Sequence, residues 1–226
     1  IMKAVRGAEI SLDSLNADPI SDKPLLERLE EQDDRRIFTI FEAIKAGVST
    51  ETINEITRVD KWFIEKLRNL ADFETEIEGK EIDEETYLRA KKLGYNDKTL
   101  RKFCSFPESF HRSASYKMVD TCAAEYSATT PYFYSSYDKA CESRRFKRSG
   151  KDVVMVLGSG PIRIGQGIEF DYSSVHCVWT LKELGYDVVI VNNNPETVST
   201  DYDTADRLYF EPLCDEDVMN IIEVEK

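Results

Sequence analysis

The chain has 226 residues, 41% of them hydrophobic, and a formal net charge of −13. This hydrophobic content is enough for one or two packed domains. The acidic charge repels phosphate backbones and anionic lipids, so we expect neither a nucleic-acid nor a membrane partner. Five scattered cysteines without a C-x-x-C pair, and only two histidines, give no zinc-site pattern. We therefore expect no metal ligands in this chain, reduced thiols and a cytoplasmic location.

The first 148 residues are predicted to be mostly helical. Pro24 lies where a first helical residue is favoured, and apolar residues at helical spacing then continue from Ile37 until Gly47. Further helices are expected to begin at four capping residues, Ser49, Asp60, Asp83 and Asp97. Gly94 is placed to end one of these helices.

Aromatic residues in this region are expected to be core residues rather than a cofactor site. The helix after Asp60 is predicted to bury one apolar face made of Trp62, Phe63, Leu67, Leu70 and Phe73. Residues 126–137 are rich in aromatic rings and hydroxyls. They could be a stacking platform for bases, but the acidic surroundings favour an irregular strap whose rings pack on a neighbouring domain.

An α/β segment follows the helical region. Residues 151–157 and 187–192 are predicted strands, with a helix over 171–184 between them. This βαβ unit requires a parallel pairing. Arg207 to Phe210 is expected to be a third short strand, and Asp215 to cap a last helix. The fold class is therefore α + α/β, a mostly helical amino-terminal domain followed by an incomplete Rossmann-like parallel βαβ domain.

The most informative feature is a glycine-dense turn directly after the first predicted strand, containing Gly158, Gly160, Gly165 and Gly167. Such a turn brings backbone N–H groups together at the ligand-binding end of a sheet. A dinucleotide site needs G-x-G-x-x-G and an acidic residue about 20 positions later. Here Arg163 occupies the third glycine position, and Glu196 comes too late, beyond a proline. A nicotinamide-dependent oxidoreductase domain remains an alternative, but the spacing disfavours it.

Four blocks of sequence resemble carbamoyl phosphate synthetase, in the segment that opens the second of its two synthetase halves. They are YKMVDTCAAE at 116–125, LGSGP at 157–161, RIGQGIEFDY at 163–172 and NPETVSTDYDTADRLYFEP at 194–212. The resemblance implies three segments: residues 1–10 as the tail of a preceding ATP-grasp domain, 11–149 as a helical oligomerisation domain ending in an irregular strap, and 150–226 as an incomplete pre-ATP-grasp domain. We therefore expect the chain to be a fragment of the large synthetase subunit.

The resemblance also implies an activity, namely an ATP-dependent ligase that makes carbamoyl phosphate from bicarbonate, glutamine-derived ammonia and two ATP, for pyrimidine or arginine biosynthesis. ATP and Mg or Mn would bind outside this chain, so we expect no cofactor and no catalytic residue within it. The implied partners are the remaining domains of the large subunit, a glutamine amidotransferase subunit or domain, and a second copy bound through the helical domain. A helical protein-interaction module is a further alternative.

Four positions are implied to line the tunnel through which the family passes carbamate between its active sites: Arg163, Gly167, Glu169 and Glu196. A small residue would keep the tunnel wide, and the charged groups would orient or repel an anion in transit. Other interpretations stay open, because Glu169 could simply favour a helix start and Arg163 a surface ion pair. His176, on the predicted helix, is expected to be a packing residue.

Overall fold

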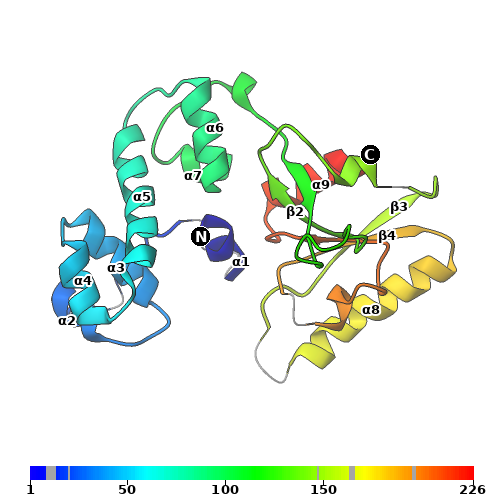
Figure 1. Cartoon of the computed structure of the whole chain (residues 1–226), viewed down its shortest axis with the longest axis horizontal. Helices are drawn as coiled ribbons and strands as arrows, with labels where there is room; N and C mark the ends of the chain where they lie inside the picture. The colour runs from blue at the N-terminus through cyan, green and yellow to red at the C-terminus, as the bar shows by residue number, and fades with distance from the viewer. Residues whose placement is uncertain (9–13, 20, 147, 163–165, 195–196) are drawn as a thin grey trace. The chain divides into compact units, whose positions relative to one another are not determined.

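The computed structural model describes residues 1–8, 14–19, 21–146, 148–162, 166–194 and 197–226. These residues form two compact units (Figure 1). One unit contains the described residues between 14 and 110, and the other combines residues 3–8 with the described part of 111–226. Each unit is described by itself below.

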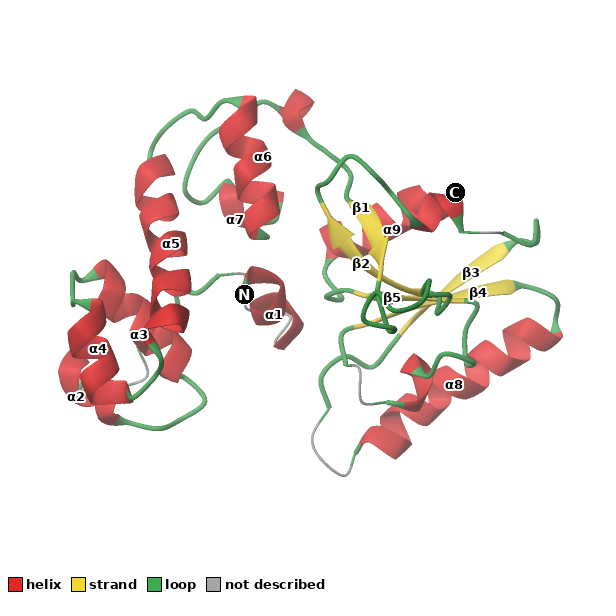
Figure 2. Cartoon of the chain, in the orientation of Figure 1, coloured by secondary structure: helices red, strands yellow, loops and turns green. Residues whose placement is uncertain are grey.

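The unit containing residues 14–110 is helical (Figure 2). Its helices are α2 (Leu25–Glu30), α3 (Arg36–Lys45), α4 (Thr50–Thr57), α5 (Lys61–Ile77), α6 (Glu84–Leu93) and α7 (Asp97–Leu100), followed by a 3-10 turn at Glu108–Phe110. Ser49, Asp60 and Asp83 cap α4, α5 and α6 through their side-chain oxygens, as predicted. The prediction for Asp97 is wrong by one residue, because the side chain of Asn96 accepts the capping hydrogen bond of α7.

Helix α5 packs against α3 and α4, and its buried face differs from the predicted one. Ile64, Leu67 and Leu70 are buried, whereas Trp62 and Phe63 are 60% and 58% exposed. Helical phase does not explain the exposure of Phe63, because residues three or four positions apart share a face and Phe63 stands four positions before buried Leu67. Both rings belong to the first turn of α5, where the described residues leave them mostly uncovered.

The second unit is built on one five-stranded sheet. Its strands are β1 (Ser115–Met118), β2 (Tyr132–Ser136), β3 (Val153–Leu157), β4 (Asp187–Asn192) and β5 (Arg207–Phe210), in the spatial order β1-β2-β5-β4-β3. Only β1 and β2 pair antiparallel, and the other neighbours are parallel. Helix α1 (Met2–Ala8) also contacts this unit through residues 3–8.

The predicted irregular strap is wrong for residues 132–136, which form β2. In this strand Phe133 lies beside Tyr209 of β5 and is fully buried. The ring centroids of the two residues are 5.4 Å apart. The aromatic and hydroxyl residues at 132–136 therefore belong to a strand. Its partner β5 lies more than 70 positions later in the sequence, where no local pattern could indicate it.

Each face of the sheet is covered by one helix. Val188 and Ile190 pack with Val178 of α8 (Gly167–Glu183) on one face. On the other face Val189 and Val191 belong to a core with α9 (Asp215–Glu225) (Figure 2). This arrangement confirms the α + α/β fold class, with the sheet extended by two strands from before residue 150. No described helix is long and apolar enough to cross a membrane.

Two details of these helices differ from the sequence prediction. Cys214 occupies the N-cap position of α9, and Asp215 is its first helical residue. His176 is exposed on α8 rather than packed in the core. Its ring lies between those of Tyr172 and Trp179, with centroids 4.2 and 5.2 Å away in edge-to-face geometry.

Candidate functional site

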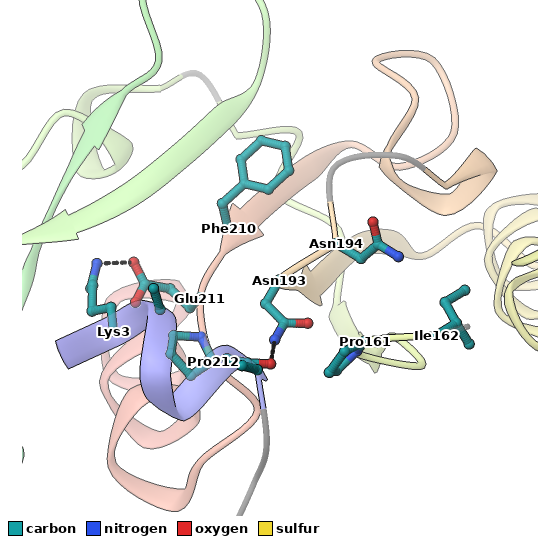
Figure 3. A pocket seen from close by; sticks show the side chains of 11 residues that line it. Lys3, Pro161, Ile162, Asn193, Asn194, Phe210, Glu211 and Pro212 are labelled. Carbon is teal, nitrogen blue, oxygen red and sulfur yellow. Dashed lines mark hydrogen bonds and ion pairs between the residues drawn. The ribbon is translucent and has the colours of Figure 1, made fainter. Parts of the chain in front are cut away.

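A pocket of about 500 Å³ lies beside the carboxyl ends of β3, β4 and β5. This is the end at which open parallel sheets bind their ligands. Helix α1 contributes one side, and the segments that follow the three strands contribute the other (Figure 3). The lining residues are Lys3, Ala4, Gly7 and Ala8 from α1, and Pro161, Ile162, Asn193, Asn194, Phe210, Glu211 and Pro212 from the sheet side.

The glycine turn begins directly after β3, beside the end of β4. The backbone N–H of Gly158 donates to the carbonyl oxygen of Val191 at 2.8 Å. A Cβ atom at Gly158 would lie 2.5 Å from the side-chain Cγ of Asn192, so only glycine fits. Gly160 has φ +70°, a left-handed conformation that favours glycine. These two glycines therefore serve close packing and chain reversal.

A buried polar network fixes the segment after β4. The hydroxyl of Ser199 donates to Oδ1 of Asp171 in α8 at 2.5 Å, and its backbone N–H donates to Oδ2 at 2.6 Å. The side-chain amide of Asn192 donates to the Ser199 hydroxyl at 3.3 Å. All three residues are buried. The network ties α8 to the end of β4 and leaves Asn193 and Asn194 beside the pocket.

Helix α1 is bound to the sheet unit by charged and polar contacts. Arg6 binds both carboxylate oxygens of Asp217 in α9, at 3.1 and 3.2 Å, and the two side chains are only 3% and 10% exposed. Burial alone would lower the pKa of Arg6, but the charge and hydrogen bonds of Asp217 raise it overall. Asn193 adds a hydrogen bond from its side-chain amide to the carbonyl oxygen of Gly7.

Glu211 is the buried carboxyl group of the pocket. Its Oε1 accepts from the ammonium of Lys3 at 2.8 Å and from the backbone N–H of Ser135. Its Oε2 is buried and has no hydrogen-bond partner among the described residues. Burial raises the pKa of Glu211, and Lys3 opposes the rise. Lys3 also donates to the carbonyl oxygen of Ser135 at 3.1 Å, so its charge is held at the pocket wall.

The predicted tunnel residues fall partly outside the described residues. Arg163, Gly165 and Glu196 lie there, so the structure does not test their predicted roles. Gly167 is the first residue of α8, and Glu169 lies exposed in its first turn. Neither is among the described residues that line the pocket.

Sequence reasoning missed the residues that organise the site. Asp171 and Glu211 lie inside the blocks at 163–172 and 194–212, so those blocks could have indicated them. No local sequence pattern marked Lys3 or Arg6 as a site residue, because each pairs with a residue more than 200 positions away. Long-range pairing of this kind is invisible to local periodicity.

The described residues do not favour a dinucleotide or a metal at this pocket. Strand β4 ends in Asn192, whose amide donates to Ser199, so no carboxylate stands where a ribose would be bound. Among the described residues, no group of three His, Cys, Asp or Glu side chains could hold a metal ion. In the helical unit, the buried charges of Glu74 and Lys91 are each paired.

Comparison with known proteins gives two domain matches. Residues 150–226 match the carbamoyl phosphate synthase preATP-grasp domain, and residues 1–118 match the oligomerisation domain of the carbamoyl-phosphate synthetase large chain. Three relatives, all carbamoyl phosphate synthase large chains, are similar over the whole of this chain. They come from Lachnoclostridium phytofermentans and Caldanaerobacter subterraneus subsp. tengcongensis, each 46% identical, and Agathobacter rectalis, 45% identical. The chain spans 22% of the length of each relative.

Proposed function

The chain belongs to the carbamoyl phosphate synthase large-chain family, with its oligomerisation and preATP-grasp domains, and from this membership we propose two roles for it. The helical unit serves assembly with a second copy and with other parts of the synthase. The sheet unit supplies one wall of the passage that carries carbamate between two active sites. The whole protein is then an ATP-dependent ligase acting on bicarbonate and glutamine-derived ammonia, and this chain alone is not catalytic.

The pocket at the carboxyl ends of β3, β4 and β5 is the observation that carries the passage role. Its volume of about 500 Å³ exceeds what a small planar anion such as carbamate requires. Gly7 and Ala8 on one side and Pro161 on the other present no long side chain to it. A passage needs such a wall, because each long flexible side chain would have to move for the cargo to pass.

The charges at the pocket support transit rather than tight binding. Lys3 is the ammonium at the wall, and its charge is already paired with Glu211. Arg6 is likewise paired with Asp217. An anion that enters therefore meets compensated charges, so it is attracted weakly and released readily. Arg163, Gly167, Glu169 and Glu196 remain proposed as further tunnel-lining positions.

ATP and a divalent metal ion belong to the proposed activity of the whole synthase. Following the family resemblance, we propose that both sites lie in other parts of the large chain. This chain then contributes the wall of the passage and takes no part in the chemistry. It keeps the passage open and shields carbamate from water between the two active sites.

The test uses a complete large chain that contains these residues. Ala4→Phe places a ring in the pocket from α1, where Ala4 is exposed and lines the wall. Gly167→Val and Glu169→Gln probe the positions implied by the resemblance. Met219→Phe, on the exposed side of α9 and away from the pocket, is the matched control.

We expect the blocking variants to retain bicarbonate-dependent ATP consumption and carbamate phosphorylation, each assayed separately, while overall synthesis of carbamoyl phosphate falls. The control keeps all three rates. If Ala4→Phe leaves overall synthesis unchanged, the pocket is not the passage. If it abolishes the two partial reactions as well, the wall acts on chemistry rather than on transit.

A further inference from the structure

Two adjacent aromatic residues on the helical unit have no role in its core. Trp62 and Phe63, on the first turn of α5, are its most exposed large hydrophobic residues among those described. Their ring centroids are 5.0 Å apart in edge-to-face geometry. Helix α5 buries Ile64, Leu67 and Leu70 further along the chain, whereas both rings of its first turn remain mostly exposed among the described residues.

An exposed pair of this kind is informative where a single exposed apolar residue is not. Aromatic side chains bury about 150–250 Å² each when covered, and tryptophan is enriched among the residues that dominate binding energy. With more than half of each ring exposed, the pair offers roughly 200 Å². That is enough for the centre of an interface whose polar rim supplies the remainder of about 800 Å² per partner.

The charges around the pair suit a contact between identical surfaces. Residues 58–66 carry three positive side chains and two negative ones, which gives a net charge of +1 in a chain of net charge −13. The positive groups are Arg58, Lys61 and Lys66, and the negative groups are Asp60 and Glu65. Two copies of an acidic chain repel each other least where the surface is close to neutral and carries both signs.

The charged groups also border the rings directly. The Lys66 ammonium lies 4.9 Å from the centroid of the Trp62 ring, and the Lys61 ammonium lies 3.5 Å from Oε1 of Glu51 in α4. The aromatic centre thus has a polar rim, which is the usual anatomy of a protein interface. Residues 58–66 are called the Trp62 patch below.

We propose that the Trp62 patch is the surface through which two copies of this chain pair across a two-fold axis. The proposal rests on the assembly role of the helical unit and specifies the residues that perform it. The patch lies inside the matched oligomerisation domain, residues 1–118, which favours a second copy over an unrelated partner. In a two-fold contact the same patch meets itself, so every change in it acts twice.

The test measures self-association of the 226-residue chain by sedimentation velocity over a concentration series. The variant is Trp62→Ala/Phe63→Ala, and the matched control is Trp179→Ala, which removes an exposed tryptophan of α8 in the other unit. Far-ultraviolet circular dichroism checks that each variant is folded. Since truncation of a central aromatic residue weakens binding at least tenfold and each change acts twice, we expect the dimer dissociation constant to rise about 100-fold or more.

A second variant tests the rim without removing the rings. Lys61→Glu/Lys66→Glu changes the net charge of the patch from +1 to −3, so we expect weaker pairing that added salt partly restores. Glu51, on α4, faces Lys61 in the wild type and would then add to the repulsion.

The outcomes separate this proposal from the broader assembly role. If the wild-type chain pairs and the double alanine variant pairs equally well, the Trp62 patch is not the interface, while assembly through another surface stands. If the wild-type chain stays monomeric at its highest soluble concentration, the proposed pairing and the assembly role both fail. If Trp179→Ala weakens pairing as strongly as the double variant does, the interface lies on the sheet unit and the proposal is overturned.

Discussion

The buried ion pair between Arg6 and Asp217 allows a quantitative prediction about how α1 is held on the sheet unit. The guanidinium contacts both carboxylate oxygens, and the side chains are 3% and 10% exposed. Asp217→Ala removes the carboxylate that contacts the buried guanidinium through both of its oxygens. Breaking a buried pair in this way costs about 3–5 kcal/mol, far more than an exposed pair contributes.

The cost is expected to appear in the unfolding of the sheet unit. At roughly 3–6 °C for each kcal/mol in a unit of this size, a loss of ~3 kcal/mol lowers its melting temperature by about 9 °C or more. Thermal unfolding of the 226-residue chain, followed by circular dichroism, measures the shift. Because two units can unfold separately, the near-ultraviolet signal should be followed as well.

A double variant distinguishes loss of charge from loss of packing. Arg6→Met/Asp217→Leu replaces the pair by apolar side chains of similar length, which is often neutral or stabilising at a buried position. We therefore expect it to recover most of the stability lost in Asp217→Ala. If Asp217→Ala lowers the free energy of unfolding by less than about 1 kcal/mol, the pair is effectively solvent-exposed and the reasoning is wrong.

Four further predictions concern single positions and the chain as a whole. Gly158→Ala should lower the free energy of unfolding of the sheet unit by about 1–3 kcal/mol, measured in urea, because its Cβ would overlap the buried side chain of Asn192. Ser49→Ala should cost about 0.5–2 kcal/mol in the helical unit, since it removes the cap at the N–H of Thr52; an unchanged urea midpoint would contradict this. The raised pKa of Glu211 means that the folded state holds the proton of this carboxyl group more tightly than the unfolded state does. The free energy of unfolding should therefore fall as the pH rises from 4.5, the ordinary pKa of a glutamate, through the pKa of Glu211 in the folded state. Glu211→Gln should flatten that fall in a pH series of unfolding curves, and a parallel pH dependence in both proteins would count against the assignment. Calorimetry of the isolated chain should detect no tight binding of ATP, and micromolar affinity would contradict the proposal that the nucleotide sites lie elsewhere.

Local chemistry made the elements of the fold predictable. Ser49, Asp60 and Asp83 cap the helices they were expected to cap, because an N-cap needs only a short polar side chain at the right position. Strand β4 runs over 187–192 as predicted, since a continuous apolar run ended by asparagine is typical of a strand buried on both faces.

Contacts between distant segments could not be predicted in the same way. Strand β2 pairs with β5 across more than 70 positions, and α1 reaches α9 through Arg6 and Asp217 across 211 positions. The error at Trp62 and Phe63 has a different origin. Hydrophobicity and spacing assigned them to the core, since Phe63 stands four positions before buried Leu67, but the described residues leave both rings of this first turn mostly uncovered.

The candidate site was predictable in its location but not in its composition. The glycine turn lies at the carboxyl end of β3, where close packing and a left-handed turn require Gly158 and Gly160, and its role in a site stays a prediction. The pocket wall depends on Lys3 and Glu211, which come together only through the docking of α1. The roles implied for Arg163 and Glu196 stay predictions.

The coupling ratio of a complete large chain carrying Ala4→Phe tests the proposed passage most directly. This ratio is the amount of carbamoyl phosphate formed for each ATP consumed, measured together in one reaction. If the pocket beside α1 is the passage, the ratio falls well below that of the wild type and of Met219→Phe, because ATP is still consumed while carbamate is lost to water. A ratio equal to the wild-type value would show that carbamate does not pass through this pocket.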